Sequence, residues 1–291
     1  MSAVTKSTST TTNLAKSLSA LPPLPATAQE ILTCFGDEFI DAHKVTAVVE
    51  GDPGICARLL GLANSAYFGL NEPVNRIDEA ISRVLGVETV RSLVLAMAIQ
   101  QSFSKKGCPE FDTERFWTES LLTAECCKRI AMQDKDASIE LRDLAYSTGL
   151  CHNLGLMALV HLEPQATNTV LMRHRDDEAK GPLKPLFQEL LDTDHRHMTA
   201  VLARTWSLPE PMVAAYEYRA DTTVPCDHSL SLVVAAGAEA VSNCKRNDEH
   251  RTNLEPWASE LGMTTRDLQS LAVLSNPQQE RIESLAQRMT R

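Results

Sequence analysis

The amino-acid sequence predicts an all-α protein. Apolar residues recur at helical spacing almost throughout the chain, and no segment shows the sustained alternation of apolar and polar residues that is typical of strands. The 291 residues suffice for one large or two modest domains, whose core needs neither disulfides nor a metal. We expect an N-terminal helical bundle lobe packed on a second helical lobe.

The first lobe is predicted over residues 21–106, after a tail at residues 1–20. Half of this tail is Ser or Thr, so it buries too little apolar surface to offset ordering, and we expect it to be disordered. Leu21–Pro25 holds three prolines and predicts an extended segment. The helices expected next are one with Asp52 as N-cap, Pro53 at its first position and its end at Gly69, one from Asp78 to Gly86, and a buried one around Val90–Met97.

The second lobe is predicted over residues 112–245, because Gly107 and Pro109 interrupt the helical pattern before it. Its expected helices are Thr113–Ala131 with Thr113 as cap, Leu141 to about Val160, Pro185–Leu191, Asp194–Trp206, Pro209–Tyr218 and Asp227–Val241. Gly237 predicts a close helix crossing. Residues 252–291 form a predicted helical extension with one helix capped by Thr264 and one opened by Asn276 and Pro277.

Composition narrows the classes of function. The net charge of −10 and the scattered arginines weigh against nucleic-acid binding. Eight cysteines without a Cys-x-x-Cys motif, together with a Met1–Ala20 segment that lacks an apolar core, predict buried, reduced thiols in a cytoplasmic protein. The longest purely apolar run, Leu93–Ile99, is too short to cross a membrane. Neither a Gly-rich phosphate loop nor a nucleophile elbow is present, so no cofactor is implied.

The segment Gly149–Gly155, with the sequence Gly-Leu-Cys-His-Asn-Leu-Gly, bears most directly on function. In a His-Asp doublet the imidazole holds a divalent ion and the carboxylate supplies negative charge that can bridge to a second ion. Here the carboxylate is replaced by the amide of Asn153, a weak metal ligand, which argues against metal-dependent hydrolysis. The simpler interpretation is a histidine, His152, at a helix end beside a capping asparagine.

Several motifs occur in the order that marks HDOD domains. They are Leu21–Pro25, Asp52-Pro53, Asn64–Gly69, Ala80-Ile81 with Leu85-Gly86, Phe116-Trp117-x-x-Ser120, Gly149–Gly155, and His195 followed by Trp206-x-Leu208-Pro209. The chain from Leu21 to about Val241 therefore resembles the HDOD family, which implies a bacterial origin. HDOD domains resemble the HD superfamily of metal-dependent phosphohydrolases and HD-GYP cyclic dinucleotide phosphodiesterases, in which His and Asp side chains from several helices hold one or two metals.

The resemblance implies where the metal ligands of the superfamily would fall in this chain. These positions are Glu119 for the first-helix His, His152 and Asn153 for the doublet, His195 for a later single His, Arg219 and Ala220 for a His pair, and Gly237, with Glu239 as the nearest acid, for the closing Asp. A dinuclear site needs about five or six protein ligands with enough negative charge to offset the two ions. We therefore interpret Glu119, His152, Asn153, His195 and Arg219 as vestigial HD-site positions, with no catalytic residue and no bound metal. If a metal were bound, its ligands would be His152, His195 and Glu119.

The leading functional hypothesis is a non-catalytic HDOD module of signal transduction or scaffolding, which acts by binding a protein partner or a small signal molecule. The alternative is a residual metal-dependent phosphohydrolase that uses Glu119, His152 and His195, with His197 or Glu239 as a further donor. Nucleic-acid binding, a third class, rests only on helices and arginines. The sequence leaves the partner and the oligomeric state open.

Arg219 is predicted to fall in the former metal pocket. There its guanidinium would pair with Glu119 or hydrogen-bond near His152, since ligands that lose a cation need another positive group or donor. The simpler interpretation is that Arg219 points to solvent at a helix end.

Overall fold

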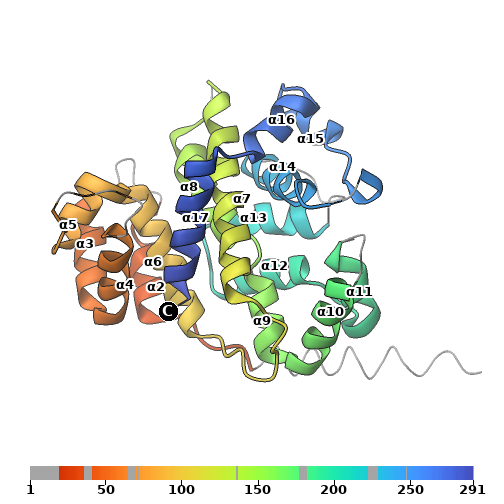
Figure 1. Cartoon of the computed structure of the whole chain (residues 1–291), viewed down its shortest axis with the longest axis horizontal. Coiled ribbons are helices and arrows are strands. Elements are labelled where there is room, and N and C mark those ends of the chain that lie inside the picture. The colour runs from red at the N-terminus through yellow and green to blue at the C-terminus, as the bar shows by residue number, and fades with distance from the viewer. Residues whose placement is uncertain are drawn as a thin grey trace, which may run out of the picture.

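The computed structural model of the chain describes residues 20–35, 41–64, 68, 70, 72–135, 137–176, 182–221, 229–246 and 248–290. Within these ranges every regular element is a helix, so the all-α prediction is confirmed (Figure 1). The predicted tail lies outside the described residues except for Ala20. No helix in the described part of the chain is long and apolar enough to cross a membrane.

The first group of helices lies at the left of Figure 1, and its buried residues belong to the same hydrophobic core cluster as those of the rest of the protein. It comprises α2 (Ala26–Leu32), α3 (Ala42–Gly51), α4 (Pro53–Ala63), α5 (Ile77–Ala80), the π-helical turn η2 (Ile81–Leu85) and α6 (Val87–Gln101). As predicted, Asp52 caps α4, since its carboxylate accepts hydrogen bonds from the N–H groups of Gly54 and Ile55 at 3.0 and 3.1 Å. The helix ends at Ala63, so the predicted end at Gly69, which lies outside the described residues, is wrong.

The helix predicted from Asp78 to Gly86 is present, but it begins at Ile77 and its second half is a π-helical turn. Gly86 ends it with a φ of +80°, a conformation that L-residues other than glycine rarely adopt. The next helix, α6, is buried on all sides from Val90 to Ile99. Because it has no solvent face, α6 joins the first group of helices to the rest of the protein.

Arg91 is the charged residue inside this junction. Its side chain is fully buried and donates to the carbonyl of Cys34 at 2.9 Å and to the Asp143 carboxylate at 2.6 Å. The guanidinium also lies 3.9 Å from the centre of the Phe35 ring. Arg91 therefore connects α6 to the end of α2 and to α8 of the second group.

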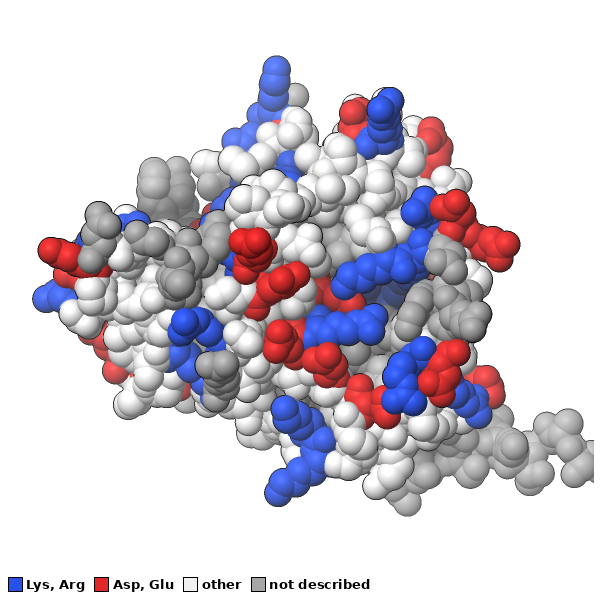
Figure 2. Space-filling view, viewed as in Figure 1, with Lys and Arg blue, Asp and Glu red and all other residues white. Residues whose placement is uncertain are grey.

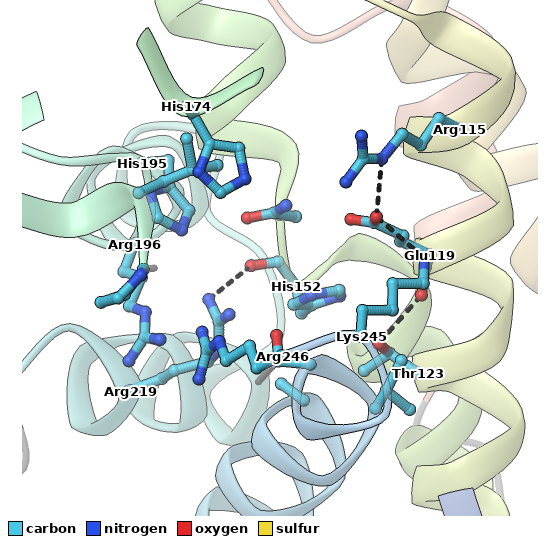
Figure 3. A pocket seen from close by; sticks show the side chains of 16 residues that line it. Arg115, Glu119, Thr123, His152, His174, His195, Arg196, Arg219, Lys245 and Arg246 are labelled. Carbon is cyan, nitrogen blue, oxygen red and sulfur yellow. Dashed lines mark hydrogen bonds and ion pairs between the residues drawn. The ribbon is translucent and has the colours of Figure 1, made fainter. Parts of the chain in front are cut away.

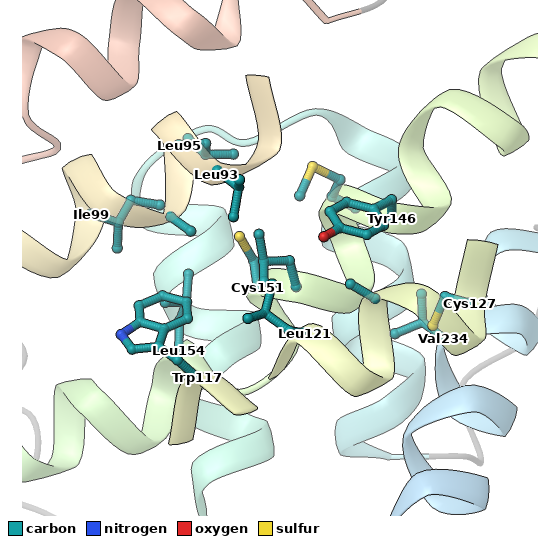
Figure 4. Packing of buried hydrophobic residues seen from close by; sticks show 14 of the residues in the cluster. Leu93, Leu95, Ile99, Trp117, Leu121, Cys127, Tyr146, Cys151, Leu154 and Val234 are labelled. Carbon is teal, nitrogen blue, oxygen red and sulfur yellow. The ribbon is translucent and has the colours of Figure 1, made fainter. Parts of the chain in front are cut away.

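The second group of helices packs around α7, the longest helix. It comprises α7 (Thr113–Gln133), α8 (Ile139–Cys151), α9 (Leu154–Leu162), α10 (Pro164–Asp176), α11 (Leu183–Leu191), α12 (His195–Thr205), α13 (Glu210–Ala220) and α14 (Ser229–Asn243). Figure 4 shows Trp117, Leu121 and Cys127 of α7 among side chains of α6, α8, α9 and α14. The cap of α7 is Asp112, whose carboxylate accepts from the Arg115 N–H at 3.0 Å, so the prediction of Thr113 as cap is wrong.

The C-terminal elements return along the second group. They are the 3₁₀ turn η3 (Asp248–His250), α15 (Glu255–Glu260), α16 (Thr265–Ala272) and α17 (Asn276–Met289). Thr264 caps α16 in a capping box with Asp267, as the sequence predicts for the cap. The last helix, α17, packs against both α7 and α4 (Figure 1). The division into residues 21–106, 112–245 and 252–291 stays a prediction.

Candidate functional site

The His152-Asn153 doublet lies at a break between two helices. Helix α8 ends at Cys151 and α9 begins at Leu154, so the prediction of one helix from Leu141 to about Val160 is wrong. The Nδ1 of His152 lies 2.7 Å from the Gly149 carbonyl, which only accepts, so Nδ1 carries the proton. Asn153 holds the N-cap position of α9 but makes no capping hydrogen bond with its side chain.

Two glycines bring the neighbouring helices close to this break. A Cβ on Gly149 would lie 2.9 Å from the Ala124 Cα of α7. A Cβ on Gly155 would lie 2.8 Å from the Met198 carbonyl carbon and closer still to two other backbone atoms of α12. The Gly155 N–H donates to Thr199 Oγ1 at 2.9 Å in the same crossing. Only glycine fits this contact, and the contact places α12 beside the doublet.

Gly237 makes the third close crossing. A Cβ there would lie 2.7 Å from the Cys127 sulfur, so the close approach predicted at Gly237 is confirmed for α14 and α7. Gly237, the position at which the resemblance implies the closing Asp, carries no side chain, and the nearby acid Glu239 lies one half-turn further along α14.

Next to these crossings lies a cavity of about 250 Å³ that opens to solvent (Figure 3). All five positions that the sequence singled out line it, namely Glu119, His152, Asn153, His195 and Arg219. Figure 3 shows His152 between Glu119 of α7 and the arginines of α12 and α13. The structure thus brings together side chains from α7, the α8–α9 break, α12 and α13.

Of the three histidines that line the cavity, His174 is half-buried, whereas His152 and His195 are buried, with 5% and 6% of their surfaces exposed. Burial lowers the pKa of the His152 imidazole well below its ordinary value, and the charge of Arg219 lowers it further. Burial, followed by Arg196 and Arg219, does the same to the pKa of His195. Both imidazoles are therefore neutral at pH 7.

The carboxylates near the cavity are engaged by cations. Glu119 accepts from Lys245 Nζ at 2.9 Å and from Arg115 Nε at 3.1 Å. Burial on its own raises the pKa of the Glu119 carboxyl, but Lys245 and Arg115 outweigh it, so the pKa is lowered. Glu119 is thus held in ion pairs with two cationic side chains.

Glu239 is likewise held in ion pairs with cationic side chains. It is 3% exposed, forms an ion pair with Arg196 and accepts from Arg246 at 3.1 Å. Thr252 Oγ1 donates to the same carboxylate at 2.9 Å. Burial raises the pKa of Glu239, but the surrounding arginines prevail and lower it to about 2. The carboxylate therefore stays ionised and bound to guanidinium groups.

Arg219 occupies the inner wall of the cavity. It is 6% exposed, and its Nη1 donates to the His152 carbonyl at 3.2 Å, which confirms the predicted hydrogen bond near His152. The alternative pairing with Glu119 and the solvent-facing orientation are both wrong. Among the residues that the structure describes, Arg219 forms no ion pair. Burial and then the charge of Arg196 lower the pKa of Arg219 to about 9, so it is still a cation at pH 7.

The donor set does not fit the metal centre of the HD superfamily. In the described ranges, no three His, Cys, Asp or Glu side chains are placed so that they could hold one ion. His197 is exposed and does not line the cavity, so it adds no donor. The space beside the two histidines holds guanidinium groups, which repel a divalent cation.

Four cationic residues of the cavity were missed at the level of the sequence. They are Arg115, Arg196, Lys245 and Arg246. They lie on α7, on α12 and just after α14, so only the fold brings them together. The available signals were weak, namely that Arg196 adjoins His195 and that Arg115 precedes Glu119 by one helical turn.

The fold and the site define an all-α protein with a cavity in which buried histidines lie beside guanidinium groups. Residues 21–222 match the HDOD domain family, and the chain belongs to this family.

Solved bacterial structures share this fold. A provisionally named signal transduction protein of Marinobacter aquaeolei superposes with a TM-score of 0.81 at 20% identity, over 98% of this chain and 66% of that one. A provisionally named phosphohydrolase of Shewanella amazonensis gives a TM-score of 0.69 at 25% identity, over 95% and 98% of the two chains. An HDOD domain protein with unknown function from Geobacter sulfurreducens gives 0.66 at 20% identity, over 91% and 89%.

One curated relative is an uncharacterized protein of Treponema pallidum. It is 25% identical over 211 residues, which are 72% of this chain. The chain spans 39% of the length of that relative.

Proposed function

We propose that this HDOD protein is a non-catalytic module of signal transduction that acts by binding a protein partner or a small signal molecule. The observation that carries the proposal is the buried guanidinium of Arg219, which donates to the His152 carbonyl within the cavity where the superfamily holds its metals. A guanidinium that is charged at pH 7 at this place opposes the binding of two divalent ions.

The state of the carboxylates supports the same proposal. Two metal ions of charge +2 need several anionic ligands, and the acids that the sequence places at or next to the superfamily positions are Glu119 and Glu239. Each is already held by two cationic side chains. Binding a metal would require these ion pairs to break and would leave the released cations beside the ion.

The second candidate is a residual metal-dependent phosphohydrolase. It is favoured by one observation, that two neutral imidazoles, His152 and His195, lie in a single cavity of a fold shared with a provisionally named phosphohydrolase. Two imidazoles alone supply no negative charge for a dinuclear centre, so this candidate ranks second.

Metal content and hydrolysis separate the two candidates. Protein purified with Mn²⁺ in the buffer is analysed by mass spectrometry for bound metal and assayed with a cyclic dinucleotide and a chromogenic phosphodiester. We expect less than stoichiometric metal and no turnover above that of His152→Ala. A double variant, Asn153→Asp with Arg219→His, restores two superfamily ligand types and is expected to bind Mn²⁺ more tightly. Stoichiometric metal with turnover that His152→Ala abolishes would contradict the proposal.

The binding role is tested separately with the intact chain as bait. Cross-linking in native extract, followed by mass spectrometry, identifies stable partners, and an extract dialysed to remove small molecules provides the comparison. A partner retained only before dialysis points to a small signal molecule, and one retained in both points to direct protein binding. Failure to retain any partner or small molecule in either extract would contradict a signalling role.

A further inference from the structure

The cavity around His152 is strongly cationic although the whole chain has a net charge of −10. Five of its described lining residues are Lys or Arg, and Glu119 is the single carboxylate among them. The cations are Arg115, Arg196, Arg219, Lys245 and Arg246. On the face shown in Figure 2, lysines and arginines gather right of centre, over the region between α7, α12 and α14, with acidic side chains beside them.

The positive charge exceeds the negative charge that contacts it. Arg115 and Lys245 share Glu119. Arg196 and Arg246 share Glu239. Arg219, the most deeply placed cation, forms no ion pair with a carboxylate among the described residues; Arg196 repels it, and Glu239 and Asp194 only partly offset this repulsion and the cost of its burial. A buried cation that no carboxylate contacts is costly, and an anion bound against it would reduce that cost.

Donors inside the cavity wall also lack acceptors. In the described part of the chain, the Nε–H groups of Arg196 and Arg219 have no hydrogen-bond partner, and neither do Nδ1 of His195, whose role depends on the tautomer, and the acceptor Oδ1 of Asn153. Arg219 is more than nine-tenths buried, so bulk water does not satisfy its Nε–H. Buried donors of this kind are nearly always paired in native proteins, which indicates an acceptor that occupies the cavity.

We propose that the cavity binds the phosphate group of a small molecule, with Arg219 and Arg196 as its principal ligands. This inference rests on the proposed function, because it assigns a ligand to a cavity in which the proposed function places no metal. A guanidinium presents two parallel N–H groups that match two phosphate oxygens. Two arginines with free Nε–H groups therefore suit a tetrahedral dianion better than a single carboxylate or a halide.

The size of the cavity limits the ligand. Its volume of about 250 Å³ lies below the range of roughly 300 to 1,000 Å³ that encloses a drug-sized molecule. Inorganic phosphate or the head group of a phosphate monoester fits within it. A cyclic dinucleotide, in which two phosphodiesters join two nucleosides in one ring, would extend beyond the cavity into solvent.

Calorimetric titration at constant ionic strength tests the inference, with inorganic phosphate, adenosine monophosphate and a cyclic dinucleotide as separate probes and chloride as the blank. We expect the first two to bind and the cyclic dinucleotide to bind more weakly than either. Tighter binding of inorganic phosphate than of the monophosphate identifies the free ion as the source, and the reverse order identifies an ester.

Arg219→Met should weaken phosphate binding by about 10- to 100-fold, the loss expected when charge-assisted hydrogen bonds are removed. The matched control is Arg204→Gln on the same helix as Arg196, because Arg204 is exposed, pairs with Glu210 and Glu217, and does not line the cavity. Arg219→Lys retains the charge but lacks the two parallel N–H groups of the guanidinium, so it should bind phosphate with intermediate affinity. It is the variant to measure if Arg219→Met does not fold.

Two results overturn the inference, namely the absence of binding by either phosphate probe, and binding that Arg219→Met and Arg219→Lys leave unchanged. Tighter binding of the cyclic dinucleotide would overturn the assignment to a small ligand. These outcomes are distinct from failure of the proposed function, which metal-dependent turnover of a phosphodiester would show, whether or not phosphate binds.

Discussion

Replacing Gly155 with alanine is expected to destabilise the fold severely. The added Cβ would lie 2.8 Å from the Met198 carbonyl carbon and even closer to His195 O and Thr199 N. All three are backbone atoms of α12, so no rotation of a side chain can relieve the overlap. The two helices must therefore separate at the point where they enclose the candidate site.

The magnitude follows from two losses. Overpacking in a tight core costs about 1–3 kcal/mol, and an overlap with backbone belongs at the upper end of that range. Separating the helices also lengthens the hydrogen bond from the Gly155 N–H to Thr199 Oγ1, which contributes about 0.5–1.5 kcal/mol. We expect a total loss of about 3–4 kcal/mol from a stability that is typically about 5–15 kcal/mol.

Urea unfolding followed by circular dichroism at 222 nm measures this loss. Gly51→Ala is the matched control, because a Cβ at Gly51, the last residue of α3, meets nothing within 4 Å. The control should leave stability unchanged or raise it by up to about 1 kcal/mol, since alanine favours helix over glycine. A loss below about 1 kcal/mol for Gly155→Ala would refute the reasoning that this crossing is closed to a side chain.

Three further predictions concern charge and capping. His152 and His195 are neutral when folded but bind protons near pH 6.5 when unfolded, so the stability they contribute is complete above pH 6.5. Below pH 6.5 the free energy of unfolding should fall by up to about 1.4 kcal/mol per pH unit for each histidine. Urea titrations at several pH values measure this slope, and an equal slope in the double variant His152→Gln, His195→Gln would contradict the prediction. Asp143→Ala leaves the buried Arg91 without its counterion and should lower the free energy of unfolding by about 3–5 kcal/mol. Arg91→Met removes the charge as well and should cost less. A lower unfolding midpoint for Arg91→Met than for Asp143→Ala would contradict this prediction. Asp52→Ala removes the cap of α4 and should lower stability by about 1–2 kcal/mol in calorimetry, and no change in Tm would count against the cap.

The helices that the sequence predicted are those whose signals are local. The cap and proline of α4, the capping box of α16 and the glycine at the end of η2 all act within one turn of the chain. Helix α10 was missed because its sequence is largely polar. Its buried residues, Thr167 and Val170, pack against a neighbour, and Thr167 Oγ1 donates to the Leu159 carbonyl of α9.

The break at His152 and Asn153 was not predicted, because the apolar pattern continues through Leu150 and Leu154 as it would in one helix. The break is associated with a tertiary contact, the crossing at Gly155, that no local pattern records. One feature of the candidate site was predictable, namely that Arg219 hydrogen-bonds near His152, because ligands without their cation need another positive group or donor. The other cations of the cavity come from several separate elements, and only the folded chain brings them together.

The position of α17 determines how motion can pass through the molecule. This helix contacts α4 of the first group and α7 of the second, and Arg281 on it lies 5.0 Å from the centre of the Phe68 ring. The two groups therefore cannot rotate against each other unless α17 slides or detaches. Hydrogen exchange in the amides of α17 would consequently report any such rearrangement, even one that starts at the opposite end of the protein.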